Sequence, residues 1–364
     1  MQVARGFSRV VPGVAVAIVL ALLARLIADS VSHGTIGLPP ISLSPVLFAV
    51  LIGMLWRNTV GVPSWATEGL QWAMHSLLRT GIALVGLRLT LSGAGSIAIT
   101  ALPISLACLA TGLAGGALVS KLFAVPRRLG VLLAIGTAVC GCTAVVAVSP
   151  VIRSRGAETA FAVTCVVLFG CLGMLFYPWL AGAFFADSPV HAGVFLGTAI
   201  HDTSQVVGSA LIYSQAAHAP DALAAASVAK LLRNLSLAVI IPLAGAWSRR
   251  QEQMEEQGVS DSAAVRRPPL IPLFVAGFIA CLVLRTLGDH LSGSQSSLWH
   301  ALVNTGETAS DVLLVCGMTA LGLSVSFGEM WRIGWRPLAA GWLVAFLVGT
   351  CSLGLNLLEH RFGW

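Results

Sequence analysis

The chain has 364 residues, of which 57% are hydrophobic and only 10% are charged, whereas soluble domains carry about 25% charged residues. This balance indicates a polytopic membrane protein and excludes a soluble enzyme with a membrane anchor, because spans of about 20 apolar residues consume most of the length. The formal net charge of +6 does not indicate a nucleic-acid partner, because the basic residues cluster at the ends of apolar segments and so report membrane topology.

Apolar runs of sufficient length predict about 11 transmembrane helices in an all-α fold. The first run follows Arg5 and Arg9 like a signal peptide, but no small-residue cleavage site follows it, so we expect a retained span. Residues 1–364 are predicted to form a single integral membrane domain, with residues 248–268 as a cytoplasmic linker. The predicted spans lie at approximately 9–28, 43–57, 78–93, 97–121, 129–152, 157–185, 190–213, 221–248, 269–287, 299–327 and 336–358.

Lysine and arginine predict the orientation, because cytoplasmic loops of membrane proteins are enriched in both residues. With the N-terminus in the cytoplasm, most of the basic residues at span ends lie on the cytoplasmic side. The main exceptions are Arg153 and Arg155, which follow a Gly-rich segment that need not cross the membrane simply. We therefore expect a multi-pass protein with a cytoplasmic N-terminus.

Two of the predicted spans are interrupted in a similar way. Residues 136–144 read Gly-Thr-Ala-Val-Cys-Gly-Cys-Thr-Ala, and residues 197–205 read Gly-Thr-Ala-Ile-His-Asp-Thr-Ser-Gln. Small and hydroxyl residues let a helix unwind at bilayer depth where the backbone lines a wet cavity, and half-helix N-termini then offer N–H donors to an anion. The alternatives are close helix packing for the first motif and a short aqueous loop for the second. Whether these two segments cross fully or re-enter is left open by the sequence.

Ionisable residues at bilayer depth are costly and therefore indicate function. We predict that His201 and Asp202 carry a coupling ion, either a proton or sodium, because histidine titrates near physiological pH. Lys230, Arg233 and Asn234 share one helix face at i, i+3 and i+4, and two cations there suit an oxyanion. Alternatively, both cations snorkel or pair with Asp202. The predicted substrate-binding residues are Gly136, Thr137, Gly141, Thr143, Gly197, Thr198, Gln205, Lys230, Arg233 and Asn234.

Other intramembrane polar residues are weaker candidates. Glu307 and Asp311 lie at i and i+4, and either acid relays a proton or pairs with Arg88. Residues 85–90 resemble residues 321–326 in spans of opposite predicted sense, which agrees with an inverted repeat, although chance similarity explains it as well. His75 lies near a predicted helix end and is expected to be solvated.

The sequence contains no nucleotide-binding, hydrolase or metal-ligand motif. The eight cysteines lie in apolar segments without a CxxC pair and are predicted to be packing residues. We therefore expect neither an enzyme nor a bound metal or cofactor.

At these motifs the sequence resembles the YeiH-like proteins, a bacterial inner-membrane family described as sulfate exporters. The residues that carry the resemblance are LSPVLFAVLIGMLWRN (43–58), LAIGTAVCGCTAVVAVSPVI (133–152), GTAIHDTSQVVGSA (197–210) and KLLRNLSL (230–237). Cys142 is a mild departure from the family pattern. The resemblance covers nearly the whole chain and implies an all-helical secondary transporter of the inner membrane, with inverted repeats and broken helices, whose substrate is sulfate or a related sulfur oxyanion.

The leading prediction is a secondary transporter that exports a small anion such as sulfate, sulfite or an organosulfonate, coupled to protons or driven by potential. One alternative is a sodium-coupled organic-anion transporter, in which Asp202 and unwound carbonyls bind sodium. Another is a membrane receptor or scaffold that binds an anion without moving it. The expected partners are the anion, the coupling ion and the lipid bilayer, without nucleic acid, and a homodimer is left open.

Overall fold

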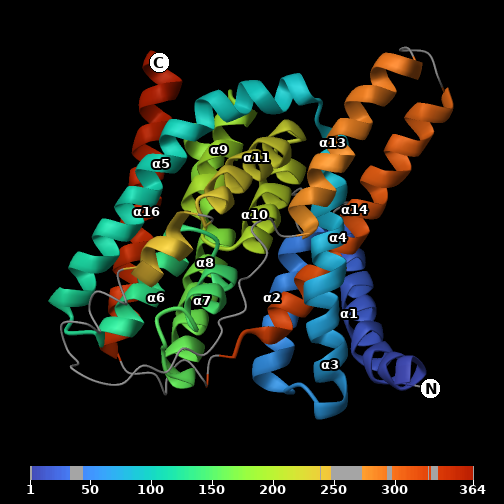
Figure 1. The fold of residues 1–364 in the computed structure, drawn as a ribbon. Helices are drawn as coiled ribbons and strands as arrows, with labels where there is room; N and C mark the ends of the chain where they lie inside the picture. Colours follow the sequence, from blue (N-terminus) through green and yellow to red (C-terminus); the bar gives the residue numbers. More distant parts are fainter. Residues whose placement is uncertain are drawn as a thin grey trace.

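The computed structural model describes residues 2–32, 44–237, 239–246, 273–292, 297–326, 328 and 335–363. All regular secondary structure in these ranges is helical (Figure 1), which confirms the predicted all-α class. The predicted linker at 248–268 lies outside the described residues.

Most of the described helices match predicted spans. In the described part of the chain, six helices are long and apolar enough to cross a membrane: α1 (Gln2–Ser32), α5 (Leu91–Leu122), α8 (Gly156–Phe184), α11 (Asp221–Leu235) with its continuation to Ala246, α13 (Leu273–Ser292) and α16 (Trp335–Phe362). α2 (Pro45–Thr59) is shorter, and α14 spans Ser297–Ser324. The amphipathic residues 64–77 are helical and run into the third predicted span as α3 (Ser64–Trp72), a π-helical turn (Ala73–Leu77), α4 (Leu78–Leu84) and a 3-10 turn (Val85–Arg88).

The helices form two bundles (Figure 1). The outer bundle contains α1 to α4, α13 and α14, and the hairpin bundle contains α5 to α11 and α16. In the outer bundle α14 runs antiparallel to α4, since Gly306 lies against Leu87 whereas Gly317 lies against Leu78; Asp311 also pairs with Arg88 at 2.8 Å. The two spans that carry the proposed repeat therefore run in opposite senses, and Arg88 has the acidic partner that the sequence suggested.

The direction of α16 fixes the directions of α5 and α8. Phe185, at the end of α8, lies against His360 near the end of α16, with ring centroids 5.9 Å apart. Val119, near the end of α5, belongs to the same apolar cluster as Ala340, near the start of α16. The end of α5 and the start of α8 therefore lie at one end of the molecule, the lower end in Figure 1, where the N-terminus also lies.

The first interrupted segment is a re-entrant hairpin between α5 and α8. It comprises α6 (Arg127–Ala138) and α7 (Cys142–Val148), which are 12 and 7 residues long and so too short to cross a bilayer alone. Because α5 ends and α8 begins at the lower end, the hairpin enters from that end and returns to it. Arg153 and Arg155 consequently lie at the same end as Arg127, which removes the main exception in the predicted charge distribution.

The second interrupted segment is a hairpin from the opposite end. It comprises α9 (Pro189–Ala199) and α10 (Thr203–Ala216). α9 starts just after Phe185, and the Tyr213 hydroxyl near the end of α10 donates to the Phe185 carbonyl at 3.3 Å, so both ends lie at the upper end. Both segments are thus broken where the sequence predicted, and their tips meet in the middle of the molecule.

Candidate functional site

Lys230, on α11, is buried and lies between the two hairpin tips. Its ammonium group donates to the carbonyl of Val139 at 2.9 Å, to that of Ile200 at 3.1 Å and also to that of His201. An ammonium group has three N–H donors, so these three carbonyls satisfy it completely.

Arg233 lies one turn further along α11 and is also buried. Its Nη2 donates to the Thr137 carbonyl at 2.9 Å, its Nε donates to the Ala138 carbonyl at 3.1 Å, and its Nη1 donates to the Thr198 carbonyl. Both cations therefore contact backbone oxygens, and in the described residues neither forms an ion pair with Asp202.

These contacts follow from the electrostatics of broken helices. The last carbonyls of a helix have no partner within the helix, they carry partial negative charge, and they are costly to bury unpaired. α6 and α9 end at the centre of the protein, so their terminal carbonyls receive hydrogen bonds from α11 instead of water. Lys230 and Arg233, which the sequence predicts as anion ligands, therefore have backbone carbonyls as their hydrogen-bond partners.

Small residues bring α9 directly against α11. A Cβ atom on Gly197 would lie 2.5 Å from the Ala226 carbonyl oxygen, so a side chain cannot be accommodated there. In the first hairpin, Gly136 packs against Val145. These two predicted ligand positions therefore have packing roles, which was the alternative considered for such residues.

Several other predicted residues lie behind the tips. The Thr198 hydroxyl donates to the Val194 carbonyl at 2.7 Å and also bonds Ser352 Oγ at 2.7 Å. Thr137 and His201 line one small buried void. His201 is 3% exposed, and its Nδ1 has no hydrogen-bond partner in the described structure.

The tips touch through Gly141 and Asp202. Gly141 has φ +68° and is the N-cap of α7. Asp202 is the N-cap of α10, because its Oδ1 accepts hydrogen bonds from the Ser204 N–H at 2.9 Å and from Ser204 Oγ at 2.6 Å. The sequence places N-capping residues where each second half-helix begins, so the N-termini of α7 and α10 start at the tips.

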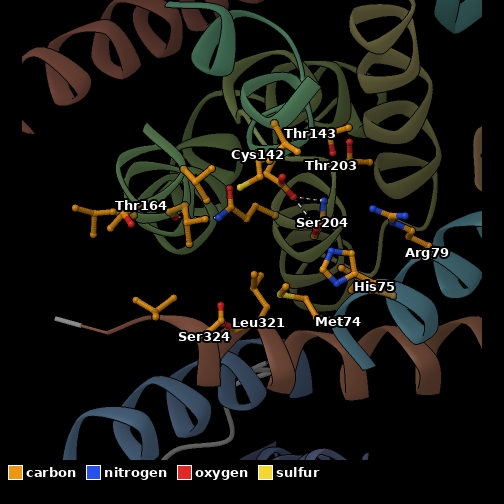
Figure 2. Close-up of a pocket in the computed structure, with 18 of the residues that line it drawn as sticks. Met74, His75, Arg79, Cys142, Thr143, Thr164, Thr203, Ser204, Leu321 and Ser324 are labelled. Carbon is orange, nitrogen blue, oxygen red and sulfur yellow. Dashed lines mark hydrogen bonds between the residues drawn. The ribbon is translucent and has the colours of Figure 1, made fainter. Parts of the chain in front are cut away.

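A cavity of about 380 Å³ lies between the two bundles, next to these N-termini (Figure 2). The hairpin bundle contributes hydroxyl, thiol, amide and carboxylate groups, and the outer bundle with the residues after α14 contributes a histidine, an arginine, two serines and apolar side chains. The polar lining residues are His75, Arg79, Cys142, Thr143, Thr164, Asp202, Thr203, Ser204, Gln205, Ser324 and Ser326.

The cavity leads towards the lower end of the molecule and is closed above. A neighbouring cavity shares His75 and Thr143 and extends to Pro150, which precedes the start of α8. Above, α10 packs on α2, and Ser44 Oγ donates to Gln215 Oε1 at 2.5 Å. The tips are therefore accessible from one end of the protein.

The outer wall carries two functional candidates that sequence reasoning missed. His75 lies in the π-helical turn, and Arg79 lies one turn later on α4. Both face the cavity in Figure 2, and π turns occur frequently at functional sites. The signal was their i, i+4 spacing, but the sequence predicted a solvated side chain for His75 and did not single out Arg79.

The predicted residues therefore fall into two layers. Thr143, Asp202 and Gln205 line the cavity. Gln205 Nε2 donates to the Val167 carbonyl at 2.9 Å, whereas its buried Oε1 has no partner in the described residues. Gly141 packs against Asp202 at the cavity floor. The layer behind the tips contains Gly136, Thr137, Gly197, Thr198, His201, Lys230, Arg233 and Asn234, whose amide donates to Thr203 Oγ1 at 3.3 Å.

Comparisons with known proteins agree with the sequence resemblance. A family model described as conserved hypothetical protein 698 matches residues 12–341. A UPF0324 membrane protein of Ralstonia nicotianae is 33% identical over 87% of this chain and 86% of its own length. A UPF0324 membrane protein of Corynebacterium glutamicum is 31% identical over 94% of this chain and 92% of its own length.

One solved structure is also similar over the full length. The sodium proton antiporter of Methanocaldococcus jannaschii at pH 8 is 14% identical, with 100% of this chain and 98% of that chain covered, at a TM-score of 0.28. A TM-score of this size does not establish a common fold.

Proposed function

The chain belongs to the UPF0324 family of membrane proteins, which is the YeiH-like group, and we propose that it is a secondary transporter that moves a small anion by alternating access. The observation that carries the proposal is the cavity between two bundles, which reaches the hairpin tips from the lower end and is closed towards the upper end. A solute bound there reaches the other side of the membrane when the contact between α10 and α2 opens and the lower route closes.

The lining of the cavity favours an anion. Arg79 supplies a permanent positive charge, Thr143 and Thr203 supply hydroxyl donors, and the N-terminus of α10 supplies partial positive charge. Substrates of this chemistry include sulfate, sulfite and small organosulfonates, which are also the substrates that the family resemblance implies. Asp202 is the carboxylate in the lining, and we assign to it the binding of a coupling proton.

The contacts of α11 argue against the sodium-coupled alternative. That mechanism uses carbonyl oxygens freed by the helix breaks as sodium ligands. In this protein the carbonyls of Val139, Ile200 and Thr198 already accept hydrogen bonds from Lys230 or Arg233. A proton on Asp202 needs no such ligands, so proton coupling fits the site better.

The proposed orientation has the lower end in the cytoplasm, within a bacterial inner membrane. α5 ends, α6 begins, α7 ends and α8 begins at that end. The basic residues at these helix ends agree with the enrichment of cytoplasmic loops in lysine and arginine; they are Lys121, Arg127, Arg128, Arg153 and Arg155. The cavity then opens to the cytoplasm, which is the side from which an exporter loads its substrate.

The direct test is transport by purified protein in liposomes. We expect saturable uptake of labelled sulfate, sulfite or taurine that depends on the pH gradient, and loss of that flux in Arg79→Gln but not in Arg128→Gln, whose side chain lies outside the cavity. An anion receptor instead predicts ligand-dependent thermal stabilisation without counterflow, and that outcome would contradict the transporter proposal.

A further inference from the structure

We infer that Lys230 and Arg233 are positioning residues that join the two hairpin tips into one rigid body, and that neither side chain contacts the transported solute. We call these two side chains, Lys230 and Arg233, the clamp. That the solute is an anion is part of the proposed function, whereas the evidence for the clamp is the set of contacts that α11 makes.

Each cation bridges both hairpins. Lys230 binds the Val139 carbonyl of the first hairpin together with the Ile200 carbonyl of the second. Arg233 does the same with the Ala138 and Thr198 carbonyls. A displacement of either tip relative to the other therefore breaks hydrogen bonds at both cations, whose side chains are buried.

The clamp has a rigid base. α11 packs closely against α9, where Gly193 and Gly197 face Ala222 and Ala226, and it also packs against α5. The tips additionally touch one another directly through Gly141 and Asp202. α11, the two tips and the floor of the cavity therefore move as one unit.

This arrangement determines how access changes. A hairpin that opened as an independent gate would expose carbonyls that Lys230 and Arg233 now satisfy. The contacts between the two bundles should break more easily than those of the clamp. The hydrogen bond from Ser44 to Gln215, for example, is one that water can replace. The switch of access consequently lies between the bundles, and the hairpins do not gate the cavity individually.

The test is hydrogen exchange at the backbone amides of residues 139–142 and 200–204, measured on the full protein in nanodiscs. Lys230→Met and Arg233→Gln should each speed exchange about tenfold or more at both tips. Both substitutions lie on α11, outside the two hairpins. Arg233→Lys, which keeps the charge and part of the donors, should restore much of the protection. Arg88→Gln removes a cation from the outer bundle and should leave the tips unchanged.

Transport kinetics provide the second readout. In Arg233→Lys we expect the maximal sulfate flux to fall while the apparent KM stays within about threefold of the wild type. Unchanged tip exchange together with a large rise in KM would overturn the inference, because that pattern identifies direct ligands. Faster exchange at only one tip would also overturn it. Hydrogen exchange is measured independently of transport. If the wild-type protein transports no anion but the Lys230 and Arg233 variants still exchange faster at both tips, that result would contradict the proposed function and leave the clamp standing.

Discussion

A Cβ atom on Gly141 would lie 2.9 Å from the Asp202 Oδ2, so the two hairpin tips touch with no space for a side chain. Gly141 also has φ +68° and ψ −130°, a backbone region that other residues essentially do not adopt. Backbone conformation and contact therefore require glycine at this position independently.

Replacing Gly141 with alanine should separate the tips and strain the turn. We expect a loss of about 1–3 kcal/mol in unfolding free energy from the backbone alone, and a strong decrease in flux because Asp202 is displaced. Thermal unfolding and liposome transport measure the two effects. Gly182→Ala is the matched control, since a Cβ atom at Gly182 in α8 meets no atom within 4 Å; a similar loss in that variant would contradict the steric explanation.

Asp202→Asn should separate coupling from folding. Asparagine is as good an N-cap as aspartate, so the hydrogen bonds from the Ser204 N–H and Oγ persist and thermal stability should change little. The variant cannot exchange a proton, so a pH gradient should no longer drive uptake, while exchange of anion at equal pH continues. Asp202→Ala, which loses the cap, should in addition cost about 0.5–2 kcal/mol. Uptake by Asp202→Asn that still follows the pH gradient would exclude Asp202 as the proton carrier.

Arg79 should determine anion affinity. A hydrogen bond to a charged group contributes about 1.5–3 kcal/mol, so Arg79→Gln should raise the apparent KM for sulfate about tenfold or more. His75→Gln, on the same wall of the cavity, should have a smaller effect. The measurement is initial flux against sulfate concentration at several pH values, with Arg128→Gln as the control.

Closure above the cavity can be tested by a covalent bond between the bundles. Ser44 Oγ and Gln215 Oε1 are 2.5 Å apart, but a cysteine at position 215 is shorter than glutamine, so cysteines at both positions should be joined by a short bifunctional methanethiosulfonate, which forms a reducible disulfide with each of them. The crosslinked protein should bind anion from one side but not transport it, and a reductant should restore flux. Each single cysteine variant is the control. Full transport with the crosslink intact would show that the bundles do not separate there.

Cys142 reports the side to which the cavity opens. Its thiol lines the cavity and is partly exposed, whereas Cys140 and Cys171 nearby are buried. A membrane-impermeant maleimide should label Cys142 in inside-out vesicles, and sulfate should slow the reaction. Cys142→Ser identifies the modified residue by mass spectrometry. Labelling of Cys142 only from the external face would reverse the proposed orientation.

The sequence predicted the two helix breaks because glycine, hydroxyl and charged residues stand out in apolar spans. It did not predict that both segments turn back, because the periodicity of a half-helix is the same whether the next half continues or returns. The direction of α7 follows only from the three-dimensional contacts of α5 and α8 with α16, which show that α5 ends and α8 begins at the same end of the molecule.

The sequence predicts which segments meet at the candidate site, and the roles of their residues stay predictions. The two motifs and the Lys230 face do meet at the centre of the protein. The sequence predicts Lys230 and Arg233 as anion ligands because it shows their charges but not the backbone carbonyls that accept their hydrogen bonds. Asp202 was the better guide, since a carboxylate that caps α10 faces the cavity.

The distance along the chain between the first hairpin and its clamp constrains how the protein is made. Lys230 lies 91 residues after Val139, and Arg233 lies 95 residues after Ala138. When α6 and α7 leave the ribosome, the residues that satisfy their terminal carbonyls have not yet been synthesised. We therefore expect the tip of the hairpin to remain hydrated until α11 is inserted, and truncation before residue 230 should leave a nascent chain that the cell's membrane quality control recognises.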